Sequence, residues 1–224
     1  MLFGMIGAGT VSRAIAGHAL RTGHDVVFCN SRGPETLAGL VEELGPHASA
    51  GTLDEVGDAD FVVLAVNWTV VREALRDLKP RDGRIVVDAT NQWASLTPVF
   101  VPDELDVGGS ELVASLIPGA RVIKAFNAMY GPVTAEDPVH PTGRRVLFYA
   151  GDDVEAKEDF RRVVEDDMGF AGVDLGALRN GRLMQVGGGP LSGLHVIRQD
   201  TPHPEGARGA AGKRRRSTPS LFGE

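Results

Sequence analysis

The sequence predicts an α/β fold built on a doubly wound parallel sheet, with a short helical segment near the C-terminal end. Three observations predict it. Short apolar runs alternate with stretches of helical periodicity along most of the 224 residues. A glycine-rich turn follows the first apolar run directly. Glycine is abundant, at 29 residues, and aromatic side chains make up only 6%, which suits a fold with many tight strand–helix turns.

The first half of the chain is expected to alternate strands with helices. The run at residues 61–66 is apolar throughout, as is typical of a strand buried on both faces of a parallel sheet. The first helix is expected to stop at Gly23, because glycine is common just after helix ends. The predicted strands are residues 2–6, 25–29, 47–50, 61–66 and 84–89, and the predicted helices are residues 11–22, 34–44, 52–57 and 70–78.

The second half continues this pattern less regularly. Residues 98–109 are expected to form a loop, and residues 183–197 a glycine-rich turn followed by a helix that carries His195 as a packing residue. Residues 200–224 are rich in Pro, Gly and Arg and are expected to be disordered. The other predicted elements are a helix at 111–116, a strand at 121–126, and a strand–helix–strand unit at 144–150, 152–168 and 172–175.

A dinucleotide-binding loop is predicted directly after the first strand, where the sequence reads GAGTVS. The first glycine permits a tight turn, and the second removes a side chain that would block a pyrophosphate. The following helix directs its free N–H groups at the phosphates. An ordinary glycine-rich turn would have the same sequence in isolation. The predicted pyrophosphate-binding residues are Gly7, Ala8, Gly9, Thr10, Val11 and Ser12, of which Ser12 replaces the usual Gly or Ala.

The end of the second predicted strand favours NADP(H) over NAD(H). An NAD site would place Asp or Glu here to bind the ribose hydroxyls, but the sequence reads Asn30, Ser31, Arg32. All three side chains can donate hydrogen bonds to a 2′-phosphate, which carries nearly two negative charges. The alternative is that Ser31 caps the next helix and that Arg32 is solvated.

These observations predict a Rossmann-type architecture in three parts. Residues 1–178 are expected to form the NADP-binding domain. Residues 179–199 are expected to be a segment for substrate binding and dimerisation, and residues 200–224 a tail. The apolar side chains at 183–197 have no second domain to pack in, so a homodimer is expected to bury them.

The motifs resemble those of NADPH-dependent coenzyme F420 reductases, also called F420H2:NADP oxidoreductases. The dinucleotide-binding part is also similar to that of pyrroline-5-carboxylate reductases and metalloreductases. The resemblance runs from about residue 2 to residue 198 and implies hydride exchange between NADPH and a deazaflavin. The matching stretches are IGAGTVSRAIA, GHDVVFCNSR, VVDATN, VIKAFN, LFYAGDD and GFAGVDLGALRNGRLMQVGGGP.

The chemistry expected of such a protein is hydride transfer from NADPH to coenzyme F420, a flavin or another small acceptor. Transfer to a flavin-like ring requires two rings in stacked contact, and no side chain has to protonate an alkoxide. The sequence agrees with this, because it contains no Tyr-x-x-x-Lys pair. Lys124 and Asn127 are the candidate catalytic residues, although Lys124 could equally face the surface. The alternative function is a non-enzymatic NADP(H)-binding sensor or interaction module.

Residues that follow the strand ends should face the ligand crevice of such a sheet. Turn capping explains Asn91 and Asn127 equally well, and helix-start packing explains Trp68. Glycines allow close approach of the backbone to a substrate, although residues 187–190 could also be a plain loop. The expected cofactor contacts are Val66, Asn67, Asn91 and Ala125. The expected substrate contacts are Met129, Gly188, Gly189 and Pro190.

Charge and composition argue against several classes of partner. A net charge of −7 is unfavourable for binding nucleic acid or an anionic membrane, and no run of residues is long and apolar enough to span a bilayer. No metal site is expected, because Cys29 is the single cysteine and the histidines lack ligand spacing. One cysteine is also compatible with a cytoplasmic location.

Overall fold

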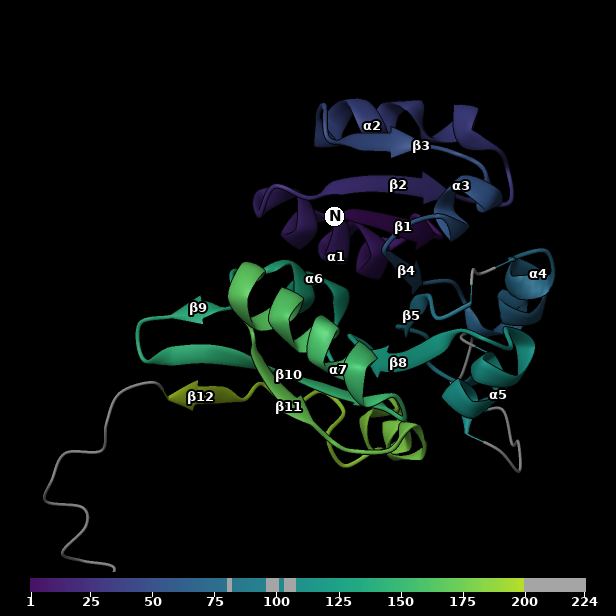
Figure 1. The fold of residues 1–224 in the computed structure, drawn as a ribbon. Helices are drawn as coiled ribbons and strands as arrows, with labels where there is room; N and C mark the ends of the chain where they lie inside the picture. Colours follow the sequence, from purple (N-terminus) through teal and green to yellow (C-terminus); the bar gives the residue numbers. More distant parts are fainter. Residues whose placement is uncertain (80–81, 96–100, 103–107, 200–224) are drawn as a thin grey trace, which may run out of the picture.

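A twisted sheet with helices on both faces forms the centre of the computed structural model, which describes residues 1–79, 82–95, 101–102 and 108–199 (Figure 1). Its parallel strands are β1 (Leu2–Ile6), β2 (Asp25–Cys29), β3 (Ala48–Ala50), β4 (Phe61–Leu64), β5 (Ile85–Asp88) and β8 (Arg121–Ala125). They lie in the order β3-β2-β1-β4-β5-β8. Because the order reverses between β1 and β4, a ligand crevice is expected at the carboxyl ends of these two strands.

The helices that connect these strands confirm the predicted alternation. They are α1 (Thr10–Arg21), η1 (Pro34–Leu37), α2 (Ala38–Leu44), α3 (Leu53–Gly57), η2 (Trp68–Val70), α4 (Val71–Arg76) and α5 (Gly109–Leu116). A further helix, α7 (Val154–Arg162), begins at Asp153, whose Oδ1 accepts a hydrogen bond from the Ala156 N–H at 2.7 Å. It continues into the π-helical turn η3 (Val163–Asp167).

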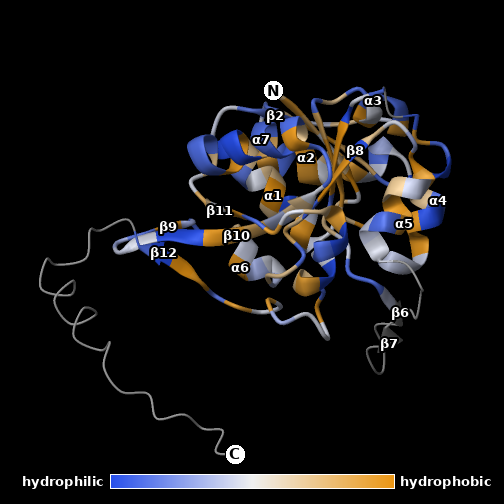
Figure 2. Ribbon diagram, turned by 60° about the horizontal axis from the view of Figure 1, so that its bottom comes forward, coloured by the Kyte–Doolittle hydropathy of each residue, from blue (hydrophilic) through white to orange (hydrophobic). Residues whose placement is uncertain are grey.

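Side chains that alternate along the strands give the sheet two apolar faces. On one face, Met5 and Phe28 pack in a cluster with residues of α1, α2 and α7. On the other face, Val27 and Val62 pack with residues of α3, α4 and α5. Figure 2 shows this arrangement as mostly hydrophobic strands at the centre and hydrophilic positions on the outer helices. Burial on both faces explains why the strand sequences are apolar without alternation.

The sequence predicts a parallel sheet, but the second half of the sheet is mixed. β10 (Gly143–Gly151) runs antiparallel to β8, and β11 (Ala171–Asp174) runs parallel to β10. Between β8 and β10 the chain forms only α6 (Gly131–Ala135) and the two-residue strand β9 (Val139–His140). A five-residue helix rises roughly 8 Å, whereas a five-residue strand spans roughly 16 Å. The short helix therefore does not return the chain to the edge of the sheet where the parallel strands begin, as a further parallel strand would require.

The prediction of a helix after Pro190 is wrong. Residues 191–196 form turns and extended chain, and β12 (Ile197–Gln199) pairs antiparallel with β10. Gly187 and Gly193 have φ values of +93° and +71°, which interrupt a right-handed helix. The helical part of this region is instead the 3₁₀ helix η4 (Leu178–Met184), which spans the expected boundary between residues 178 and 179.

A short antiparallel pair, β6 (Trp93–Ser95) and β7 (Val101–Pro102), lies near and partly within the stretch predicted as a loop. Other positions of that loop, at 98–100 and 103–107, are outside the described residues, and Gly109 already belongs to α5. The expectation of a disordered tail at 200–224 also falls outside the described residues.

Candidate functional site

The predicted phosphate loop lies between β1 and α1, where the strand order reverses. Gly7 has a φ of +100°, and a Cβ atom there would lie 2.6 Å from the carbonyl oxygen of Ala65, so this turn requires glycine. Ser12 is fully buried, and its hydroxyl donates to the Gly7 carbonyl at 2.7 Å. The hydrogen bond ties helix to turn, which explains how serine replaces the usual glycine or alanine.

Gly9 is a glycine for a different reason. Its φ of −79° and ψ of −176° are open to any residue. A Cβ atom at Gly9 would meet no other atom within 4 Å. Open space therefore lies in front of the unpaired N–H groups at the start of α1. A pyrophosphate requires this arrangement of donors and space.

The loop forms one wall of a cleft with a volume of about 470 Å³, whose other wall comes from the carboxyl ends of β4 and β5. A second pocket of about 580 Å³ lies between the end of β2 and α4. Gly7, Val66 and Val70 line both cavities. We therefore treat the two cavities as one site and call it the cofactor trough. Val70 is 41% exposed in the middle of the trough, where a bound dinucleotide would cover it. The predicted cofactor residues that line the trough are Gly7, Ala8, Gly9, Thr10, Val11, Asn30, Ser31, Val66, Asn67 and Asn91.

Asn30 and Ser31 line the β2 end of the trough, and Arg32 follows them in the chain without lining it. Asn30 Oδ1 accepts from the Arg32 backbone N–H at 2.8 Å, and Asn30 Nδ2 donates to the Thr36 hydroxyl at 3.0 Å. The amide of Asn30 therefore shapes the turn. The side chains of Ser31 and Arg32 are exposed and have no partner within the described chain, and Ser31 does not cap η1. Both remain available to a phosphate.

The other end of the trough is aromatic. Trp68 and Trp93 line it and are only 7% and 8% exposed. The Trp93 ring packs against Gly187, where a Cβ atom would overlap the ring. Among the described lining residues of this cleft, none has a titratable side chain. The sequence analysis did not identify Trp93, whose only signal is its position shortly after a buried strand.

Lys124 lies outside the trough, in a buried polar cluster behind it. Its Nζ lies 3.0 Å from Asp88 Oδ2, and the two residues are direct register partners on β8 and β5. Their side chains are 3% and 0% exposed. Ser110 and Thr90 donate hydroxyl hydrogen bonds to the same carboxylate at 2.7 and 2.6 Å. Burial lowers the pKa of Lys124, and the charge of Asp88 opposes that effect.

This cluster gives Lys124 a positioning role. Its ammonium group also donates to the carbonyl oxygen of Thr90, a residue that lines the trough. Lys124 thus holds the backbone at the end of β5 in place. Neither of the two predicted possibilities, a catalytic lysine at the crevice or a surface lysine, matches this buried position.

Asn127 and Asn91 form an amide pair that joins β5 and β8 to the C-terminal segment. Asn91 Nδ2 donates to the Asn127 carbonyl at 3.1 Å, and Asn127 Nδ2 donates to Asn91 Oδ1 at 3.2 Å. Asn127 Nδ2 also donates to the Met184 carbonyl, while Asn91 Oδ1 accepts from the Val186 N–H at 3.0 Å. The structure therefore gives both amides a turn-holding role.

The remaining predicted residues lie behind or beside the trough. Ala125 and Met129 are buried in the core at 0% and 7% exposure. Between them, Phe126 is the one non-glycine residue of the described chain with a positive φ, at 63°. Gly188 borders open space, whereas Gly189 packs tightly on the backbone of η4. Gly188 and Pro190 belong to the turns that follow η4.

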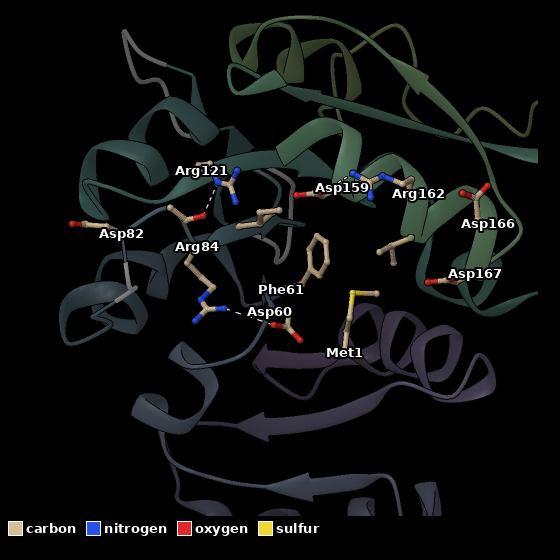
Figure 3. Close-up of a pocket in the computed structure, with 13 residues that line it drawn as sticks. Met1, Asp60, Phe61, Asp82, Arg84, Arg121, Asp159, Arg162, Asp166 and Asp167 are labelled. Atoms are coloured by element: carbon tan, nitrogen blue, oxygen red, sulfur yellow. Dashed lines mark hydrogen bonds and ion pairs between the residues drawn. The ribbon is translucent and has the colours of Figure 1, made fainter. Parts of the chain in front are cut away.

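A larger cavity, of about 740 Å³, opens at the opposite edge of the sheet, at the amino ends of β4, β5 and β8 (Figure 3). Some of its charged groups are paired with one another. Arg84 lies 3.9 Å from Asp60, and Arg162 donates to Asp159 at 2.7 Å. Ligands of open α/β sheets bind at the carboxyl ends of strands. The trough, and not this cavity, is therefore the candidate site.

Three further features bear on chemistry. Burial raises the pKa of the Cys29 thiol to about 11, so this cysteine is a poor nucleophile at neutral pH. The described part of the chain contains no group of three or more His, Cys, Asp or Glu side chains arranged to hold a metal ion. In the same part, no helix combines the length and the apolar character that crossing a membrane requires.

Comparison with known proteins connects this geometry to a family. A family model described as coenzyme F420-dependent NADP oxidoreductase matches residues 2–92, which contain the phosphate loop and the Asn30–Arg32 segment. A hypothetical protein from Sinorhizobium meliloti of known structure is 34% identical. The similarity covers 89% of this chain and 96% of that protein, with a TM-score of 0.81.

Two more distant relatives have reductase names. A protein from Arthrobacter sp. FB24, assigned as an F420-dependent NADP reductase, is 24% identical, with a TM-score of 0.66 over 79% of this chain and 84% of its own. The rat (Rattus norvegicus) metalloreductase STEAP3 is 28% identical over 189 residues, which are 82% of this chain but 35% of the metalloreductase. This chain thus spans about a third of that protein.

The family match covers the residues that build the phosphate-binding half of the trough, and the S. meliloti protein extends the likeness to nearly the whole chain. Residues 2–92 therefore belong to the coenzyme F420-dependent NADP oxidoreductase family and form its NADP-binding domain.

Proposed function

We propose that this protein is an NADP-dependent reductase that transfers the hydride of NADPH to coenzyme F420 or to another flavin-like acceptor that stacks on the nicotinamide. The observation that carries the proposal is the chemistry of the aromatic end of the trough. Trp68 and Trp93 line that end with apolar surface, and the described lining residues offer no titratable side chain. Hydride transfer to a conjugated ring requires stacked contact, whereas a carbonyl acceptor requires a general acid for the alkoxide.

The names of the relatives support the same acceptor class. The family model and the Arthrobacter protein both carry F420 in their descriptions. In the proposed reaction NADPH loses a hydride and becomes NADP⁺, and the oxidised acceptor gains that hydride together with a proton from solvent. The protein's part is to hold the two rings in contact and to exclude water between them.

The test is NADPH oxidation followed by absorbance, with F420, FMN, FAD, a quinone, a ferric chelate and simple ketones as separate acceptors. We expect turnover with F420 or a flavin and none with the ketones. The Gly9→Val variant, which should not hold the cofactor, serves as the inactive control. Faster turnover of a ketone than of every flavin-like acceptor would contradict the proposal.

Arg32 is expected to set the preference for NADPH over NADH. Its guanidinium is exposed and has no partner within the described chain, and the residue before it, Ser31, lines the trough. Removing one charge-assisted contact should cost about 1.5–3 kcal/mol, or roughly tenfold to a hundredfold in affinity. Fluorescence titration of the Arg32→Ala variant should show weaker NADPH binding and nearly unchanged NADH binding. Equal affinity of the unmodified protein for both nucleotides would contradict the assignment of this site.

We also propose that the protein is a homodimer that pairs through its C-terminal segment. Part of that segment packs on the chain's own sheet, since Met184 is fully buried and Leu191 is partly buried beside it. Leu194 and Val196 are not covered in this way, at 45% and 36% exposure. A second copy of the chain is the proposed cover for these side chains, because two-fold dimers are the commonest oligomers.

The Leu194→Asp substitution is expected to dissociate this dimer. It would place a charge without a partner in the interface, while the trough is left intact. Light scattering at micromolar concentration should give the dimer mass for the unmodified protein and the monomer mass for the variant, with NADPH affinity retained. A monomer mass for the unmodified protein would refute the proposed dimer.

A further inference from the structure

Helix α4 supplies a charged wall at the β2 end of the cofactor trough. Glu73, Arg76 and Asp77 all line the pocket there, opposite Ser31. All three side chains are exposed, and none has a hydrogen-bond or ion-pair partner within the described chain. Their charged groups are therefore free to face a ligand in this part of the pocket.

The charges decide which part of the dinucleotide this wall can receive. Glu73 and Asp77 lie three residues before and one residue after Arg76, so two carboxylates accompany one guanidinium. A 2′-phosphate, with nearly two negative charges, would be repelled by that pair. Ser31 lines the far side of the pocket and Arg32 follows it in the chain, so a hydroxyl and a positive charge there form a better phosphate site than the α4 wall does.

A neutral purine suits the α4 wall. A guanidinium stacks favourably on the face of an aromatic base, and the adjacent carboxylates do not oppose that contact. They can also accept hydrogen bonds from an exocyclic amino group. Pro34 and Leu53 line the same pocket and give the base apolar contact.

We infer that Arg76 is a specificity residue for the adenine base, on which its guanidinium stacks while Arg32 holds the 2′-phosphate. This inference rests on the proposed binding of NADPH in the trough. It gives different roles to Arg76, which lines the pocket, and to Arg32, which follows the lining residue Ser31. Arg32 distinguishes NADPH from NADH, and Arg76 contributes equally to both because both contain adenine.

The experiment compares Arg76→Ala with Arg32→Ala and with a matched control, Arg72→Ala. Arg72 is an exposed arginine of the same helix that does not line the pocket. Dissociation constants are measured by fluorescence for NADPH, for NADH and for reduced nicotinamide mononucleotide, which has no adenosine. Melting temperatures of the three variants establish that each is folded.

The expected results differ for each variant. Arg76→Ala should weaken NADPH and NADH alike, by about 3- to 30-fold, and leave the mononucleotide unaffected. Arg32→Ala should weaken NADPH alone, and Arg72→Ala should change nothing. Loss of only NADPH affinity in Arg76→Ala would make Arg76 a phosphate ligand and overturn the inference. Equal dissociation constants for Arg76→Ala and Arg72→Ala would also overturn the inference. In that case, normal NADPH binding by these variants would leave the proposed function unaffected.

Discussion

Replacing Gly9 with valine is expected to abolish NADPH binding and leave the protein folded. The backbone of Gly9 tolerates any residue, and a Cβ atom there meets nothing in the protein within 4 Å. The added methyl groups would instead occupy the space in front of α1 that a bound pyrophosphate would need. We expect the dissociation constant for NADPH to rise more than a hundredfold.

The stability of this variant should change little. Gly9 is the N-cap residue of α1, so valine costs about 1 kcal/mol at that position, or roughly 2–4 °C in melting temperature for a chain of this size. Gly39→Val is the matched control, because Gly39 lies in α2 and also has open space at its Cβ position. Unchanged NADPH affinity in Gly9→Val would show that the cofactor binds elsewhere.

Replacing Lys124 with methionine is expected to destabilise the protein by about 3–5 kcal/mol, because it leaves the Asp88 carboxylate charged, buried and without its cation. The double variant Lys124→Met, Asp88→Asn should recover more than half of that loss. Asparagine carries no charge but keeps a side-chain oxygen that can accept the hydrogen bond that the Thr90 N–H now donates to Asp88. Urea denaturation of the single and double variants measures both values.

Two further variants distinguish this effect from loss of any ion pair. Lys157 lies 2.9 Å from Asp174 with both side chains partly exposed, so Lys157→Met should cost less than about 1 kcal/mol. In Asp88→Asn the lysine is left without its counter-charge, and burial depresses its pKa further below the usual 10.5. The unfolded chain then binds more protons than the folded one, so stability should rise with pH toward 10.5. Equal losses in Lys124→Met and Lys157→Met would contradict the buried-pair account.

The first half of the fold was predictable because its signals are local. Gly7, the apolar run after residue 60 and the missing carboxylate at Asn30 each identify a strand end or a ligand contact within a few residues. The direction of β10 has no such signal. Its apolar pattern is the same in a parallel or an antiparallel pairing, and only the short helix α6 limits the connection before it.

The parts of the candidate site that depend on a local backbone turn could be predicted from the sequence. The parts that depend on the register between two strands could not. Lys124 was recognised as an unusual residue at a strand end, but its partner Asp88 is 36 positions away. Once the register of β5 and β8 is known, the two opposite charges are adjacent. Trp93 and Arg76 are likewise defined by what lies across the trough from them, which no short stretch of sequence contains.

The amide pair of Asn91 and Asn127 also determines how the C-terminal segment can open. The Val186 N–H reaches its acceptor only while the pair is intact, and the Gly193 N–H donates to the carbonyl of the neighbouring Ala128. Separation of the segment from the sheet must therefore break these hydrogen bonds together. In hydrogen exchange, the two amide protons should have the same protection and lose it together, so that residues 186–193 would open as one cooperative unit next to the aromatic end of the trough.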